Sequence, residues 1–203
     1  MPTSETDSGR AASTPRRDYR PEAGLLDELA ALGALGTVSE GARTSAEMAE
    51  GALQILRRAT GASAGLILAE RAGDLEAAAG FGVGDGLQRM VRGSLGRETR
   101  MFAAIRATPD PIVVDVDRAP LHSETLAAMR ADGLTNVAIV GLPAAGELIG
   151  ILGLGWREPP PERVPTTLLR QAAALVAVSI ANARLVERLE ATLVAERRIS
   201  EEH

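Results

Sequence analysis

Lysine and cysteine are absent from this chain of 203 residues, which has two histidines and four aromatic residues. Without lysine, the protein cannot form a Schiff base or use a lysine general base or a phosphate-binding lysine. Without cysteine, it has no thiolate nucleophile, disulfide, iron–sulfur cluster or cysteine-ligated zinc. A Ser–His–Asp triad would depend on His122, because His203 is the last residue. These absences argue against an enzyme.

The charge balance is acidic: the formal net charge is −5 at pH 7, and all 22 basic residues are arginine. Nucleic-acid-binding proteins usually carry a basic face, so we expect no nucleic-acid partner. The N-terminal residues contain no apolar segment of the kind found in signal peptides, and we expect a cytoplasmic protein. The most apolar stretch, 137–156, contains five glycines and Pro143. This composition favours two strands joined by a turn over a membrane-spanning helix, so we expect no membrane contact.

Local patterns predict the order of helices and strands. Residues 1–22 are rich in Ser, Thr, Pro and Arg and are expected to form a disordered tail. Leucines at helical spacing follow, and a second helix is expected over 45–60 with Gly61 as its C-terminal cap. Strands are expected at 64–69, 75–81, 110–116 and on both sides of a turn at 143–147. Further helices are expected at 87–91, at 123–132 with Ser123 as N-cap, and from 166 onward.

The last predicted helix is longer than a compact domain of this size needs, because roughly 35 residues at about 1.5 Å each exceed 50 Å. After residue 183 its apolar residues thin to a stripe. A heptad frame places Leu175, Asn182 and Leu189 at one core position and Val178, Leu185 and Thr192 at the other, with an interruption at Glu196. The pattern predicts a coiled coil.

Asn182 allows two interpretations. In the heptad frame it would be a polar core residue that sets the register of two helices, and otherwise its side chain would form a hydrogen bond within its own domain. We divide the chain into a tail (1–22), a domain (23–183) and a coiled-coil linker (184–203). The N- and C-terminal helices are expected to form a homodimer.

Four segments, in this order, resemble a GAF domain, a small-molecule sensing module common in bacterial signalling proteins. They are residues 52–68, 110–123, 140–152 and 180–185. The resemblance covers about residues 25–190. It implies an α+β fold in which an antiparallel sheet of five or six strands carries the N- and C-terminal helices on one face and a ligand pocket on the other. A long C-terminal signalling helix completes the implied fold.

The residue types exclude several ligand classes of the family. The Asn-Lys-Phe-Asp-Glu signature of cyclic-nucleotide-binding members requires a lysine. Bilin-binding members attach their chromophore through a cysteine, and sulfoxide-reducing members need catalytic cysteines. A haem-binding member would need a histidine such as His122, and we do not expect haem because the chain offers few aromatic walls. The expected ligand is therefore an unidentified small molecule that binds without a covalent bond.

Five residues are candidates for ligand contacts: Arg97, Arg100, His122, Asn136 and Trp156. Either arginine could clamp a carboxylate or phosphate at the pocket border, or be an ordinary surface residue. His122 would otherwise be a loop histidine bonded to backbone, and Trp156 would otherwise fill the edge of the core.

These features predict a sensor domain of a bacterial signal-transduction protein, in which a ligand or partner acts through a dimeric C-terminal helix on an output domain. The charged end of that helix looks like the linker before a histidine kinase, phosphatase or cyclase, so we expect the chain to be part of a longer protein. The alternative is a ligand-free dimerisation or scaffold module, favoured by abundant alanine and few aromatic residues.

Overall fold

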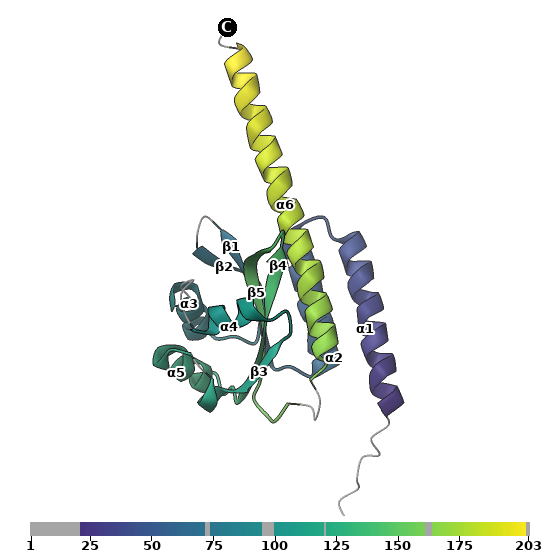
Figure 1. The fold of residues 1–203 in the computed structure, drawn as a ribbon, viewed down its shortest axis with the longest axis vertical. Coiled ribbons are helices and arrows are strands. Elements are labelled where there is room, and N and C mark those ends of the chain that lie inside the picture. The colour runs from purple at the N-terminus through teal and green to yellow at the C-terminus, as the bar shows by residue number, and fades with distance from the viewer. Residues whose placement is uncertain (1–20, 72–73, 95–99, 120, 161–163, 202–203) are drawn as a thin grey trace, which may run out of the picture.

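The computed structural model describes residues 21–71, 74–94, 100–119, 121–160 and 164–201. Within these ranges, the side chains of residues 21–24, 90–94, 100, 101, 187 and 195–201 are outside the description. Residues 1–20 of the expected tail and residues 202–203 of the expected linker also lie outside it. The described part has the predicted α+β fold, a five-stranded antiparallel sheet with helices packed against it (Figure 1).

The sheet has the strand order β2-β1-β5-β4-β3, so that β5 is its middle strand. Its strands are β1 (Ala64–Arg71), β2 (Asp74–Phe81), β3 (Ile112–Asp115), β4 (Asn136–Ala144) and β5 (Glu147–Trp156). Both expected hairpins are confirmed, because β1 pairs with β2 and β4 pairs with β5. The turn between β4 and β5 has two residues with positive φ, Ala145 at 50° and Gly146 at 82°. Positive φ at both positions is the backbone that a two-residue hairpin turn needs.

Helices α2 (Ser45–Thr60) and α6 (Thr166–Glu201) cover one face of the sheet, and α1 (Pro21–Gly41) packs against these two helices (Figure 1). α2 has the expected bounds, with Thr44 as N-cap and Gly61, at a φ of 65°, as C-cap. The helices form the main core with Ile149, Leu152, Leu154 and Trp156 of β5. Fully buried members of this core include Leu35, Met48, Leu53, Leu56, Leu152, Leu168, Leu169, Ala172 and Val176. Each buried leucine contributes about 1.5–3 kcal/mol relative to an exposed one.

Shorter elements cover the opposite face: α3 (Asp85–Ser94), α4 (Arg100–Ala107), α5 (Ser123–Ala131) and a 3-10 turn, η1 (Val116–Arg118). They form a second core cluster that includes Phe102, Ile105, Met129 and Ile151. The sequence patterns did not predict α4. The expected N-cap of α5 is wrong by one position, since His122 rather than Ser123 has the extended backbone of a cap.

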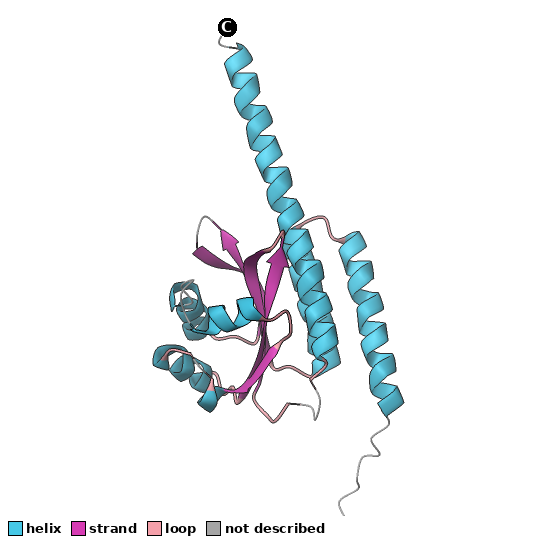
Figure 2. Ribbon diagram, viewed as in Figure 1, coloured by secondary structure: helices cyan, strands magenta, loops and turns pink. Residues whose placement is uncertain are grey.

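α6 contains 36 residues and is therefore about 54 Å long. As Figures 1 and 2 show, its second half extends beyond the sheet. The first half, as far as Ile180, packs one of its sides against the main core. Among the described residues, one helical segment, Thr166–Val194, is long and apolar enough to cross a membrane. The core helix of a folded domain meets the same criteria of length and composition.

Candidate functional site

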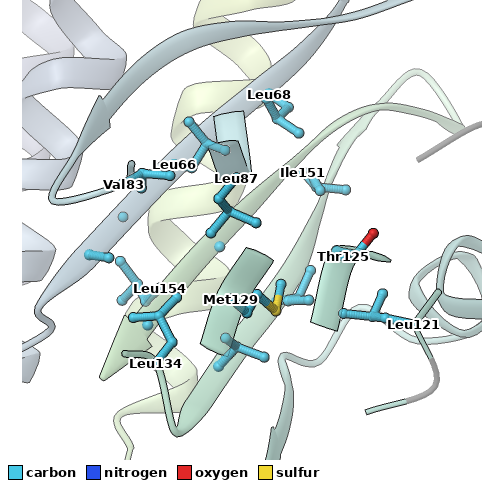
Figure 3. A pocket seen from close by; sticks show the side chains of 16 residues that line it. Leu66, Leu68, Val83, Leu87, Leu121, Thr125, Met129, Leu134, Ile151 and Leu154 are labelled. Atoms are coloured by element: carbon cyan, nitrogen blue, oxygen red, sulfur yellow. The ribbon is translucent and has the colours of Figure 1, made fainter. Parts of the chain in front are cut away.

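A cavity of about 70 Å³ lies between the sheet and the helices α3 and α5 (Figure 3). Strands β1, β4 and β5 form one side, and α3, α5 and their adjoining loops form the other. The lining residues are Ala64, Gly65, Leu66, Leu68, Val83, Leu87, Leu121, Thr125, Met129, Leu134, Val137, Ile139, Ile151, Gly153, Leu154 and Gly155. The cavity is thus on the face of the sheet opposite α1, α2 and α6.

Gly153 lies in the middle strand at the base of the cavity, where it pairs with Leu66 of β1 and Ile139 of β4. A Cβ atom at Gly153 would meet no atom closer than the Leu66 carbonyl oxygen, at 4.0 Å. By contrast, a Cβ atom would come within 2.5 Å of a neighbour at Gly141 and within 2.2 Å at Gly150. At Gly150 the neighbour is the Leu68 backbone, so close packing requires glycine there, whereas the space beside Gly153 is open.

The lining is almost entirely hydrocarbon. Thr125 provides its one side-chain oxygen and Met129 its one sulfur, and both belong to α5 (Figure 3). Both are buried, with 1% and 8% of their surface exposed. Thr125 and Met129 are four residues apart, so one side of α5 faces the cavity, and Leu121, just before the helix, also lines it. None of the described residues that line the cavity is charged.

An arginine that follows β5 joins three segments of the chain beside the cavity. The guanidinium of Arg157 donates hydrogen bonds to the backbone carbonyls of Gly82 at 2.7 Å, Asp132 at 2.8 Å and Ser63 at 3.3 Å. We call these four residues the Arg157 cluster. They connect the end of β5, the start of β1, the loop after β2 and the end of α5.

The Asp132 side chain adds a second connection between the same loop and α5. Its carboxylate accepts a hydrogen bond from the backbone N–H of Gly84 at 2.7 Å. Val83 lies between Gly82 and Gly84, and Leu134 lies two residues after Asp132. Both Val83 and Leu134 line the cavity. The hydrogen bonds therefore hold part of the cavity wall in position.

Three of the five residues predicted to contact a ligand have described side chains, and none of these lines the cavity. Arg97 lies outside the described residues. Arg100 is the first residue of α4, and its side chain is outside the description. His122 is exposed and makes no capping hydrogen bond, although the preceding residue, Leu121, does line the cavity.

Asn136 and Trp156 are register partners in β4 and β5. Asn136 Oδ1 accepts a hydrogen bond from the Thr135 hydroxyl at 3.2 Å. Trp156 is 3% exposed, belongs to the main core and donates its indole N–H to the Thr60 carbonyl at 3.1 Å. The sheet separates this indole from the cavity. The interpretation that Trp156 fills the core edge fits its position, and a contact with a ligand in the cavity does not.

The residues predicted to form a dimer helix lie along α6. Leu175 is partly buried against the main core. Val178, Leu185 and Leu189 are 55–57% exposed, and Asn182 is exposed as well. Among the described residues, the Asn182 side chain has no hydrogen-bond partner. The described residues therefore do not support the second interpretation of Asn182, a hydrogen bond from its side chain within its own domain.

A second hollow, of about 860 Å³, lies on the surface between α4, the β4–β5 hairpin and α6. Charged side chains of both signs line it, among them Arg106, Glu147 and Arg170. Arg170 is already paired with Asp110 at 2.9 Å. Among the described residues, no three His, Asp or Glu side chains lie close enough to hold a metal ion.

The cavity lining was missed from the sequence because its leucines, isoleucines and valines have the same pattern as an ordinary core. Two local signals could have indicated it. Gly153 and Gly155 alternate in a strand that is otherwise mostly Leu and Ile, and glycine inside a strand often marks the close approach of another group. The four-residue spacing of Leu121, Thr125 and Met129 is the second signal.

Solved structures of low sequence identity share this fold. The GAF domain of a phosphoenolpyruvate-protein phosphotransferase from Coxiella burnetii has a TM-score of 0.65 at 19% identity, over 80% of this chain and 98% of that one. A domain from Sinorhizobium meliloti, described as part of a two-component sensor histidine kinase, has a TM-score of 0.53 at 22% identity, over 66% and 88%. The chromophore-binding domain of a bacteriophytochrome from R. palustris has a TM-score of 0.61 at 13% identity, over 85% and 65%.

The comparison with protein families agrees with the fold. No curated protein matches the chain. The family model described as GAF domain matches residues 46–180, which is more than half of the sequence. The match begins in α2 and ends in α6, and it includes all five strands of the sheet. The chain therefore belongs to the GAF domain family.

Proposed function

We propose that this GAF domain is the sensor domain of a bacterial signal-transduction protein, in which a small molecule binds non-covalently in the cavity and changes the arrangement of α6 in a dimer. The observation that carries the proposal is the position of β5 between the cavity and α6. Ile151 and Gly153 of this strand line the cavity, whereas Leu152 belongs to the same core as α6. Packed cores transmit small displacements, so a ligand that moves β5 also acts on α6.

The dimer is supported by apolar side chains that the single chain leaves exposed to water. Leu25, Leu26 and Leu29 of α1 are 55–66% exposed. α6 also exposes Val178, Leu185, Val186, Leu189, Leu193 and Val194. A second copy packed along these helices would bury them, at about 1.5–3 kcal/mol for each leucine or valine fully covered. Asn182 lies along the same helix, where a polar residue would set the register.

The output domain that we propose is a histidine kinase, phosphatase or cyclase joined to the C-terminal end of α6. The support is the exposed second half of α6, together with the similarity in fold to a domain of a protein described as a sensor histidine kinase. We propose a cytoplasmic location and a regulatory rather than an enzymatic role.

The proposal is tested with chimeras in which α6 continues into a histidine kinase core, joined at several helix lengths. Gly153→Val fills the base of the cavity with a side chain, and Gly41→Val adds the same side chain at the end of α1, where no atom lies within 4 Å. We expect Gly153→Val to change the autophosphorylation rate several-fold and Gly41→Val to leave it unchanged. Equal rates in all folded chimeras would contradict the sensor role.

A ligand-free dimerisation module is the second candidate, and the small volume of the cavity, about 70 Å³, favours it. Equal rates in the chimeras would support this candidate. In either case the dimer depends on α6, which sedimentation of the full chain and of a chain ending at Asn182 can test. We expect the shortened chain to dimerise more weakly, and an equally strong dimer would contradict the coiled-coil part of the proposal.

A further inference from the structure

We infer that the ligand of the cavity is a small uncharged molecule with an almost entirely hydrocarbon surface, such as a short alkyl chain or a single ring, with at most one hydroxyl-sized polar group. The inference rests on the proposed function, because it assigns a chemical class to the ligand of the proposed sensor. Four features support it: the absence of charge in the lining, the pairing of the charged groups beside it, the open space at Gly153 and the size of the cavity.

Among the described residues, the lining offers no group that can pair with an ion. None of its sixteen residues is charged, and Thr125 supplies the one side-chain oxygen (Figure 3). A carboxylate, phosphate or ammonium group that entered would lose its hydration without gaining an opposite charge. We expect such an ion to bind on the order of 100-fold or more weakly than a neutral molecule of the same shape.

Three charged residues beside the cavity whose side chains are described, Arg157, Asp132 and Arg130, are already bonded to the protein. Arg157 donates to three backbone carbonyls, and the Asp132 carboxylate accepts from the Gly84 N–H. Arg130 on α5 pairs with Asp117 at 2.7 Å. An anionic ligand could recruit Arg157 only by breaking the hydrogen bonds that hold the cavity wall. These arginines therefore serve the fold and not a bound anion.

Gly153 provides space for an apolar group at the base of the cavity. Glycine weakens the middle of a strand, and it persists there where another group approaches the backbone closely. No protein atom makes that approach, since the nearest one lies 4.0 Å from the position of a Cβ atom. Leu66 and Ile139 pair with Gly153 from the two neighbouring strands and also line the cavity. A flat or narrow hydrocarbon group fits between them.

The volume of the cavity favours a small ligand. About 70 Å³ is roughly half of the 150 Å³ of an engineered apolar cavity that binds benzene. A molecule of a few heavy atoms therefore fits without rearrangement. A single ring fits once Met129 moves, and the unbranched side chain of methionine changes rotamer easily.

Two pairs of probes with matched skeletons test the inference on the full chain: 1-butanol with butyrate, and toluene with benzoate. Binding is followed by saturation-transfer NMR and by the melting temperature. At about 100 times its Kd, an uncharged probe should raise the Tm by roughly 5–10 °C, whereas the carboxylates should leave it unchanged.

Gly153→Val should abolish binding of the uncharged probes, and Gly41→Val should preserve it. The measured quantity is the ligand-induced change in Tm, because valine in a strand alters the Tm of the free protein by itself. If Gly153→Val does not fold, Gly153→Ala is used instead, and a reduced affinity is expected.

The ligand class and the sensor role can fail separately. Binding of the carboxylates as tight as that of the uncharged probes, or no binding of either uncharged probe, would overturn the ligand class. The kinase chimeras would then decide the sensor role independently. If an uncharged probe binds and Gly153→Val abolishes its binding, the ligand class is supported. This holds even where the kinase rates of the chimeras do not differ.

Discussion

Replacing Arg157 by methionine should destabilise the domain more than an exposed arginine normally would. Methionine keeps most of the aliphatic chain but removes the donors that reach the carbonyls of Gly82, Asp132 and Ser63 at 2.7, 2.8 and 3.3 Å. A hydrogen bond within a protein contributes about 0.5–1.5 kcal/mol net. Since water can reach the released carbonyls, we take the lower part of that range for each bond. The sum is about 2 kcal/mol, which lowers the Tm of a domain of this size by roughly 4–8 °C.

Urea unfolding followed by circular dichroism measures this loss, with Arg170→Met as the matched control. Arg170 makes one surface ion pair with Asp110, at 2.9 Å and with side-chain exposures of 45% and 64%. Such a pair contributes about 0–1 kcal/mol. Hydrogen exchange at the Gly84 amide should also become faster in Arg157→Met than in the control. If Arg157→Met is no more destabilising than Arg170→Met, the Arg157 cluster does not hold the cavity wall.

Three further substitutions test the helix and the core. Leu189→Glu should weaken the dimer at least about 10-fold in sedimentation, because it places a charge in the apolar stripe, and Ala191→Glu on the other side of α6 should not. Asn182→Leu should raise the thermal stability of the dimer and loosen its register, and a fall in stability would count against its place in the stripe. Trp156→Phe should lower the free energy of unfolding by about 1–3 kcal/mol, because it leaves the Thr60 carbonyl without its indole donor. The fluorescence of the native tryptophan should be blue-shifted and resist acrylamide, and strong quenching would contradict its burial.

Elements with clear local signals at both ends could be predicted from the sequence. α2 combines an apolar stripe with Gly61 in a left-handed cap, and the β4–β5 hairpin is marked by a turn that contains Gly146. α4 has no comparable signal. It is eight residues long, and its buried Phe102 and Ile105 span less than one repeat of a helical pattern.

The candidate site could be predicted much less well than the fold. Polar and aromatic residues were chosen for their chemistry, yet Trp156 belongs to the core and His122 is exposed. A residue that lines an apolar cavity and a residue that fills a core have the same pattern in a sequence, so Leu66 and Ile139 were not distinguishable. The role of Arg157 depends on backbone carbonyls that are 25 to 94 residues away in the chain. Contacts of that kind leave no periodic signal.

The distance between the two copies of α6 is the most direct test of coupling between the cavity and the helix. Because the chain has no cysteine, Ala191→Cys introduces a single labelling site on the exposed part of α6, on the side away from the apolar stripe. Double electron–electron resonance between spin labels in the dimer then measures the separation with and without saturating toluene. We predict a shift on the order of 1–2 Å or more, the size of helix movements at subunit interfaces, and its loss in Gly153→Val. An unchanged distance distribution, with toluene shown to be bound, would contradict the coupling.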